Sequence, residues 1–458
     1  MKRSRSDAVF AVIGAASGLG NAFRFPTLCA QYGIVFVAVY ALMLVAVCFP
    51  LLCAELHFGR QICGGRRGKI WRIILRAATL NSAFIAAYYG VICAKLGSTG
   101  AAFAIFTGEE RGGAVLFVVT LILTLAAAFF ILREGNRVLA KTGKITVISS
   151  LVMFSVLAVM GLVGGNGMPK VNFSCLASGA VWADALGQAL LALSLASGIM
   201  PSFARVHRVR VLPAALAIIG CNLLGCTLSA LATAPYIPFI AQTVGIKSGL
   251  ELYKTAVFAL FSGKTARSLA GTAIFSVLTL VAIHSLCSLA NPFVSKLAVN
   301  IKGAAVKRLG AKNLVPACFC LFSALLAPLF MYSGIQVLTA CDRMACSVTA
   351  VVIAFAECLF FALSKGILPH SQGHSRGAIA FFTGFVNFFI RFFCPAVTGA
   401  LALFSLCSAR FDCFPPLATA TAFVSASAIA LAAPLTQLTI FVKRFKIRLK
   451  KKAAVANF

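Results

Sequence analysis

An apolar run from about residue 8 to residue 30 is interrupted by the sequence GAASGLGN, Gly14 to Asn21. Its three glycines, followed by Asn21, Arg24 and Pro26, predict a break in a helix that would otherwise span a membrane. Such a break frees peptide groups, which is tolerated only where the backbone is buried in protein or lines a polar cavity. The freed carbonyls suit a cation and the freed N–H groups suit a carboxylate. A packing helix of small residues would explain the glycines, but not Asn21 and Arg24 at membrane depth.

A second apolar run, at about residues 182–206, also has a weak middle. Apart from Leu195, small and hydroxyl residues occupy Ser194 to Gly198, where a stable helix would carry leucine or isoleucine. We therefore expect a second unwound segment there. Two interrupted helices at corresponding places are typical of an inverted repeat, with a binding site between them at the midplane of the membrane.

Charged, imidazole and hydroxyl side chains also lie within the apolar runs. Arg24 and Asp342 are each costly alone at membrane depth, and the cost falls if they pair. His284 is followed by Ser285, which is the candidate pair for an intramembrane enzyme. Adjacent residues project on different sides of a helix, so this pair does not indicate an enzyme.

The composition places these residues in a membrane protein. Hydrophobic residues make up 61% of the 458 residues and charged residues only 11%, and the mean hydropathy is +0.98. This is too little polar surface for a soluble domain. The apolar runs predict an all-α membrane protein with twelve transmembrane helices. They lie at about residues 8–30, 33–57, 79–106, 113–132, 141–164, 182–206, 211–233, 270–299, 313–333, 342–364, 378–405 and 417–443.

The charges predict the orientation of these helices. The net charge is +31, and most Lys and Arg fall in connections that would lie on one side of the membrane. This positive-inside pattern predicts cytoplasmic termini, with residues 444–458 as a basic tail, and contact with anionic lipid rather than nucleic acid. The connection from Ala234 to Leu269 would lie outside as a lid. The basic, then apolar N-terminus lacks a cleavage site and should remain as the first span.

The 17 cysteines mostly lie inside apolar runs, without CxxC pairs or His/Cys clusters. We interpret them as small buried apolar residues and expect neither a zinc site nor an organic cofactor.

The sequence AVIGAASGLGNAFRFP, Ala11 to Pro26, resembles the first-span signature of the neurotransmitter:sodium symporter family, whose bacterial members carry the LeuT fold. The run VWADALGQ, Val181 to Gln188, is similar to the sixth-span motif of that family. Further matches are Tyr40, Pro50, Glu55, Gly59, Ala87 to Tyr89, Ser285 to Pro292, Glu357 and Arg391 to Pro395. The resemblance implies a 5+5 inverted repeat over residues 8–164 and 182–364, followed by two helices at 378–443. Spans one and six would be unwound at mid-membrane.

The resemblance also implies a site for an amino acid. Leu19 and Gly20 would donate N–H groups to its carboxylate, and Tyr89 its hydroxyl. The carbonyls of Ala16, Leu191 and Ala192 and the hydroxyl of Ser194 would hold the ammonium group. The side-chain pocket would be lined by Ile85, Leu191, Ser197, Ser285 and Leu289, which favours a neutral, mostly hydrophobic substrate. Tyr89 is also compatible with an interfacial tyrosine.

The family's first sodium site would comprise Ala16, Asn21, Ala192 and Asn222. Oxygen ligands of this kind suit a hard cation. Ala192 stands where the family has a hydroxyl residue, so the site is weakened rather than lost. Asn222 is also compatible with an ordinary interhelical amide.

The second sodium site would use the carbonyls of Gly14, Ser17 and Val281 with the hydroxyl of Ser285. Where the family motif has a threonine, this chain has His284. An imidazole can bear the charge that sodium would bring, which permits proton coupling or sodium-independent transport. A neutral histidine that is hydrogen-bonded between helices is the alternative. One or two sodium ions are therefore expected.

Arg24 and Asp342 occupy the positions that form the external gate in the family, with Leu191 as an aliphatic lid. The inner gate does not match, because no Arg-Trp pair precedes the first span and Val299 replaces an acid. Asp7 with its neighbouring arginines does not reveal how the cytoplasmic side closes. Glu55 and Gln188 are expected to form hydrogen bonds between helices.

Together these features predict a symporter that imports a neutral amino acid or a related small amine by alternating access. A four-helix bundle of spans one, two, six and seven would rock against a scaffold. A non-transporting amino-acid sensor on the same fold is the alternative. The short connection from Gly108 to Gly113 lacks room for the insertion of animal members, so we expect a bacterial cytoplasmic membrane protein, as a monomer or homodimer.

Overall fold

The computed structural model describes residues 14, 18–60, 65–108, 113–163, 171, 173–206, 210–237, 249–300, 310–332, 334–364 and 378–412, and their regular structure is helical. The α-helices are α2 (Phe25–Tyr32), α3 (Val35–Met43), α4 (Phe49–Phe58), α5 (Gly65–Phe106), α6 (Gly113–Glu134), α7 (Asn136–Val163), α8 (Gly179–Ala192), α9 (Ile199–Val206), α10 (Val211–Thr233), α12 (Gly249–Leu260), α13 (Lys264–Asn300), α15 (Ala311–Tyr332), α16 (Gly334–Asp342), α17 (Ala350–Ala362), α18 (Ala378–Phe388) and α19 (Cys394–Asp412). Short π-helical turns are η1 (Gly20–Arg24), η2 (Leu44–Cys48), η5 (Arg343–Thr349) and η6 (Phe389–Phe393), and 3-10 turns are η3 (Ser174–Ala177) and η4 (Ala234–Tyr236).

Within the described residues, 9 helical stretches are long and apolar enough to cross a membrane. They are Val35–Phe58, Arg67–Phe106, Gly113–Glu134, Val138–Val163, Val211–Tyr236, Lys264–Asn300, Ala311–Pro328, Ala340–Ala362 and Phe381–Ser408. Each overlaps one of the twelve predicted runs. Of the other three runs, the first is described only in part, the sixth is broken, and the twelfth lies outside the described residues together with the basic tail.

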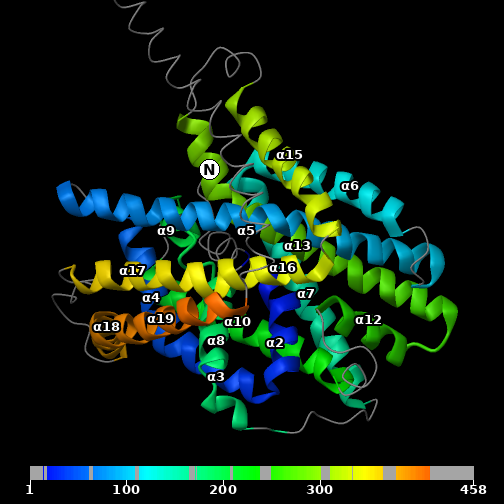
Figure 1. The fold of residues 1–458 in the computed structure, drawn as a ribbon, viewed down its shortest axis with the longest axis horizontal. Helices are drawn as coiled ribbons and strands as arrows, with labels where there is room; N and C mark the ends of the chain where they lie inside the picture. The colour runs from blue at the N-terminus through cyan, green and yellow to red at the C-terminus, as the bar shows by residue number, and fades with distance from the viewer. Residues whose placement is uncertain are drawn as a thin grey trace, which may run out of the picture.

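Long helices form the centre of the molecule, and lipid-facing helices surround them. In Figure 1, α5 and α17 run nearly parallel across the view. α5 also packs along α13, where the rings of Phe103 and Phe275 stack with centroids 5.5 Å apart. By contrast, large apolar side chains on α6 and α7, such as Ile122 and Val159, are exposed. Exposure of this kind suits a surface covered by lipid rather than water.

The sixth run is broken as predicted. α8 ends at Ala192 and α9 begins at Ile199, and the turns between them include Ser194, Ala196 and Gly198 at φ of 53°, 51° and 75°. A left-handed backbone is costly for residues other than glycine, so the break must be held by its surroundings. The carboxylate of Glu55 on α4 accepts a hydrogen bond of 2.8 Å from the N–H of Ala196. The buried, freed peptide group is thereby satisfied.

The first run has irregular backbone at the predicted place. Ala15 to Ser17 lie outside the described residues, Gly18 lies in a bend, and η1 and α2 follow. Other spans satisfy carbonyls of η1: Gln188 of α8 donates to the Gly20 carbonyl at 2.9 Å, and Ser229 of α10 donates to the Asn21 carbonyl at 2.8 Å. The contacts of Gln188 and Glu55 confirm the interhelical hydrogen bonds expected for both.

The predicted lid is described in part, as η4, α12 and the start of α13, which begins at Lys264, before the predicted end of the connection at Leu269. Residues 238–248 lie outside the described residues. The start of α12 packs directly on η1. A Cβ atom at Gly249 would lie 2.3 Å from the carbonyl oxygen of Phe23. Only glycine permits this close approach of the two backbones.

Candidate functional site

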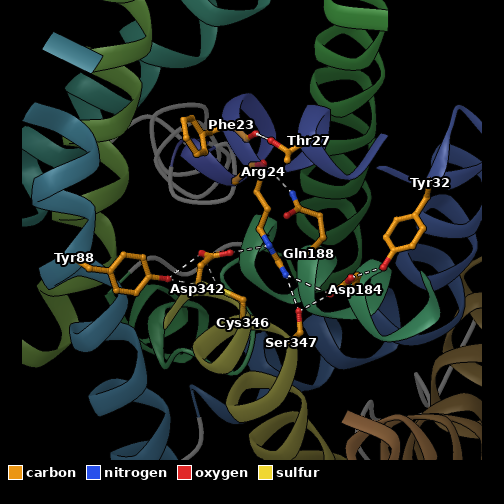
Figure 2. Close-up of polar contacts among 11 residues, drawn as sticks. Phe23, Arg24, Thr27, Tyr32, Tyr88, Asp184, Gln188, Asp342, Cys346 and Ser347 are labelled. Carbon is orange, nitrogen blue, oxygen red and sulfur yellow. Dashed lines mark hydrogen bonds and ion pairs between the residues drawn. The ribbon is translucent and has the colours of Figure 1, made fainter. Parts of the chain in front are cut away.

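Arg24, at the end of η1, lies between two carboxylates. Its Nε is 3.0 Å from an oxygen of Asp342, and its Nη2 is 3.7 Å from an oxygen of Asp184 and 2.6 Å from the hydroxyl of Ser347. The side chains of the two ion pairs are only 11–23% exposed. Figure 2 shows the guanidinium pointing into the space between the acids. We call Arg24, Asp184, Asp342 and Ser347 the gate cluster.

Two tyrosines that are not part of the gate cluster form hydrogen bonds to its acids. The hydroxyl of Tyr88 on α5 donates to Asp342 at 2.9 Å, and that of Tyr32 on α2 donates to Asp184 at 2.7 Å. Ser347 also donates to Asp184 at 2.8 Å. The gate cluster and its two tyrosines therefore join the first span and α8 to α5 and the tenth predicted span, from both halves of the chain (Figure 2).

The predicted pair of Arg24 and Asp342 is present, but the motif VWADALGQ alone does not assign Asp184, Ser347, Tyr32 or Tyr88 to it. The available signal was an acidic residue inside an apolar span, which needs a partner wherever it is buried.

A cavity of about 330 Å³ lies against the gate cluster. Its lining includes Arg24, Asp342 and Asp184, the lid residue Leu250 and two of the predicted substrate residues, Leu19 and Tyr89. We call it the gate cavity. Both substrate residues are nearly fully buried as side chains.

A second cavity, the central cavity, has a volume of about 10 Å³. Five predicted substrate residues line it: Ile85, Leu191, Ser194, Ser197 and Leu289. Its described lining carries no charged side chain. The volume accepts about one water molecule, so a bulky substrate side chain requires movement of the lining.

The broken spans meet next to the central cavity. A Cβ atom at Gly20 would lie 3.3 Å from Cδ2 of Leu191, so the predicted aliphatic lid packs directly on the first span. A Cβ atom at Gly18 would lie 2.7 Å from Oγ of Ser285. Ser285 therefore contacts the first span and is not part of the described lining of the central cavity. Ala16, the remaining predicted substrate residue, lies outside the described residues.

Three residues of the first predicted sodium site converge. Nδ2 of Asn222 is 3.4 Å from Oδ1 of Asn21 and 3.3 Å from the carbonyl of Ala192. Tyr40 donates its hydroxyl to Oδ1 of Asn222. In this arrangement the amide nitrogen of Asn222 bridges two oxygens, those of Asn21 and Ala192, which are the kind of ligands that a hard cation prefers. Asn222 is thus an interhelical amide here, and its role as a cation ligand stays a prediction.

At the second predicted sodium site, a histidine side chain contacts one of the predicted ligands. The carbonyl of Gly14, one of its predicted ligands, is hydrogen-bonded to Nε2 of His284 at 3.1 Å. Val281 and Ser285 lie on the same buried face of α13, and Ser17 lies outside the described residues. Of the residues considered for the inner gate, Val299 is 76% exposed, and Asp7 lies outside the described residues.

Sequence comparison identifies relatives of this chain. A family model, the Sodium:neurotransmitter symporter family, matches residues 2–98 and 101–444. The sodium- and chloride-dependent transporters XTRP3A of Mus musculus and XTRP3 of Homo sapiens are each 41% identical over 92 residues, 18% of this chain. The matched part spans only 15% of the length of each of these relatives.

Structure comparison places the fold. The crystal structure of MhsT in complex with L-phenylalanine matches with a TM-score of 0.75 at 20% identity, over 87% of this chain and 98% of that chain. The chain thus has the predicted LeuT fold. Since the family model covers nearly the whole sequence, this multi-pass membrane protein belongs to the sodium:neurotransmitter symporter family.

Proposed function

We propose that this protein imports a neutral amino acid together with sodium, by alternating access between the two sides of the membrane. The observation that carries the proposal is that the gate cluster links the two broken spans, because Arg24 ends η1 of the first span and Asp184 lies on α8 of the sixth. Arg24 closes on Asp342 and Asp184 against the gate cavity, and the separate central cavity has an uncharged described lining. A gate held by ion pairs over a neutral pocket can enclose a substrate that brings its own charges.

The polar groups of the broken spans fit the ends of a zwitterion. The peptide N–H groups of Leu19 and Gly20 and the hydroxyl of Tyr89 are proposed to bind the carboxylate. The hydroxyl of Ser194 and the carbonyl of Leu191 are proposed to bind the ammonium group. Binding of the substrate would require little rearrangement of these groups, because the neighbouring spans already hold the irregular backbone in place.

The uncharged lining of the central cavity selects against charged substrates. A charged side chain placed against Ile85, Leu191 and Leu289 would lose its hydration without gaining a partner. MhsT, whose fold this chain shares, was crystallised in complex with L-phenylalanine, a neutral amino acid, which supports the same substrate class.

Sodium is proposed to bind at the first site, between Asn21, Ala192 and Asn222, with the substrate carboxylate nearby. An ion at this point would join the first span to α8 and α10, so binding of sodium and of substrate would favour each other. The names of the XTRP3 relatives include sodium dependence, which agrees with this proposal.

Closing the gate cluster and opening the opposite side would complete the cycle. The bundle of spans one, two, six and seven is proposed to rock against the scaffold that contains α5 and α13. We place the protein in a bacterial cytoplasmic membrane with both termini in the cytoplasm, from the distribution of Lys and Arg.

Uptake into proteoliposomes tests the proposal. Radiolabelled amino acids from glycine to phenylalanine, with lysine and glutamate as charged controls, are offered under a sodium gradient or a proton gradient. We expect sodium-driven accumulation of neutral amino acids only. Accumulation of lysine or glutamate, or equal uptake without sodium, would contradict the proposal.

Counterflow distinguishes a transporter from the alternative, a sensor on the same fold. Liposomes preloaded with unlabelled substrate should accumulate labelled substrate transiently if the protein transports. Binding of labelled substrate to the purified protein without counterflow would favour the sensor.

A further inference from the structure

His284 on α13 contacts polar groups of its own helix and of two other elements. Its Nε2 is 3.1 Å from the carbonyl oxygen of Gly14 in the first run and 3.3 Å from the hydroxyl of Ser288 on α13. Its Nδ1 is 3.0 Å from the hydroxyl of Thr142 on α7. The side chain is buried, with the residue only 2% exposed.

The partners indicate which ring nitrogen carries the proton. A peptide carbonyl can only accept, so Nε2 must donate its N–H to Gly14. In a neutral imidazole, Nδ1 then accepts a hydrogen bond, which the hydroxyl of Thr142 can donate. A neutral imidazole with the proton on Nε2 therefore satisfies both contacts without an ion.

The ring occupies a narrow slot between two backbones. A Cβ atom at Gly143 of α7 would lie 3.1 Å from Cε1 and from Nε2 of His284, and a Cβ atom at Gly14 would lie 2.7 Å from Cα of Gly143. The first run and α7 thus approach closely at this level because both carry glycine there. Side chains in this slot would press the ring out of place.

The described residues at this point do not supply the ligands that a sodium ion needs. A hard cation needs several oxygen ligands, but at the Gly14 carbonyl the ring N–H of His284 occupies a place that a cation would take. The imidazole adds no oxygen where a threonine would offer a hydroxyl. The hydroxyl of Ser285 lies against Gly18 of the first span.

We propose that the Nε2–H group of His284 takes the place of the cation at the second site, so that one sodium ion, at the first site, drives each transport cycle. The hydrogen bond from His284 to Gly14 ties the first span to α13, as a shared ion would. Since this donor is part of the chain, its attraction does not depend on the sodium concentration. The inference rests on the proposed sodium-coupled transport and specifies its stoichiometry.

The number of bound sodium ions tests the inference directly. Equilibrium binding of sodium-22 to the purified full-length protein should saturate at one ion per chain, in the presence of the best substrate from the uptake panel. Replacing His284→Thr supplies the missing hydroxyl and frees the Gly14 carbonyl, and we expect the count to rise to two. The Hill coefficient of sodium-dependent uptake should rise with it, from about one towards two.

Variants of the first sodium site show at which of the two sites each counted ion binds. Asn21→Ala should reduce the count of the natural chain from one to zero. The combined variant His284→Thr/Asn21→Ala should retain one ion. Thermal unfolding with and without sodium shows whether each variant is folded, because a bound ion raises the melting temperature.

The outcomes separate this inference from the proposed function. A count of two in the natural chain would overturn the inference and leave sodium-coupled transport intact, and that measurement needs no variant. A count of zero would overturn sodium coupling as well. Uptake driven by a proton gradient in the natural chain but not in His284→Thr would also overturn the inference, since His284 would then exchange its proton during the cycle.

Discussion

Neutralising the two acids of the gate cluster one at a time tests how the gate closes. In Asp342→Asn and Asp184→Asn, the side chain keeps its size but loses its charge. Arg24 remains beside one carboxylate in each single variant, so neither leaves the buried guanidinium wholly unpaired. We expect both variants to fold and to bind substrate more weakly, with the larger loss in Asp342→Asn.

The distances from Arg24 to the two acids predict which variant loses more binding free energy. At an effective dielectric constant of about 20, the attractions at 3.0 and 3.7 Å differ by only about 1 kcal/mol. Asp342 also lies within hydrogen-bond distance of Arg24, whereas Asp184 does not. A charge-assisted hydrogen bond contributes about 1.5–3 kcal/mol. We therefore expect a loss of about 2 kcal/mol in gate closure for Asp342→Asn and about 1 kcal/mol for Asp184→Asn.

Equilibrium binding of the labelled substrate measures these losses. A loss of about 2 kcal/mol corresponds to about 30-fold weaker binding, and about 1 kcal/mol to about fivefold. Tyr88→Phe and Tyr32→Phe are matched controls, because each removes one hydrogen bond to the same acids and keeps both charges. Each control should weaken binding by less than the corresponding acid variant.

The double variant Asp342→Asn/Asp184→Asn provides the decisive comparison. It leaves Arg24 buried without a carboxylate, and that state typically costs about 3–5 kcal/mol. The double variant should therefore lose more than the sum of the single variants. Strict additivity, or an equal loss in the two single variants, would refute the view that Arg24 is shared between two acids of unequal weight.

Contacts outside the gate cluster give three more predictions. Glu55→Ala should lower the free energy of unfolding by about 1–3 kcal/mol, because the N–H of Ala196 loses its acceptor; Glu55→Gln should restore most of it in thermal unfolding, and an equal loss in both variants would argue against this bond. Gly249→Val should speed dissociation of bound substrate, because its Cβ would lie 2.3 Å from the carbonyl of Phe23, while Gly263→Val, with only an ordinary contact at 4.0 Å, should not. Asn222→Ala should raise the sodium concentration for half-maximal uptake about tenfold or more, whereas Thr227→Ala, whose hydroxyl bonds within α10, should leave it unchanged; similar sodium curves would exclude Asn222 as a ligand.

The sequence alone determined the broken spans and the class of protein. Apolar runs and glycine-rich or hydroxyl-rich interruptions are local features, and they act through backbone propensity and the need to satisfy peptide groups in a membrane. For this reason the break between Ser194 and Gly198 was predictable. The pairing of Arg24 with Asp342 was also accessible, because an isolated charge in a membrane requires a partner.

Only the tertiary structure decided which distant groups meet. Ser347 lies 323 residues from Arg24, and His284 lies 142 residues from Thr142, yet each pair is in contact. No local pattern encodes such a meeting, because it depends on how whole helices pack and on small residues such as Gly14 and Gly143 that let backbones approach. Whether a histidine in an apolar span carries an ion or replaces one is therefore decided by packing, not by its place in the sequence.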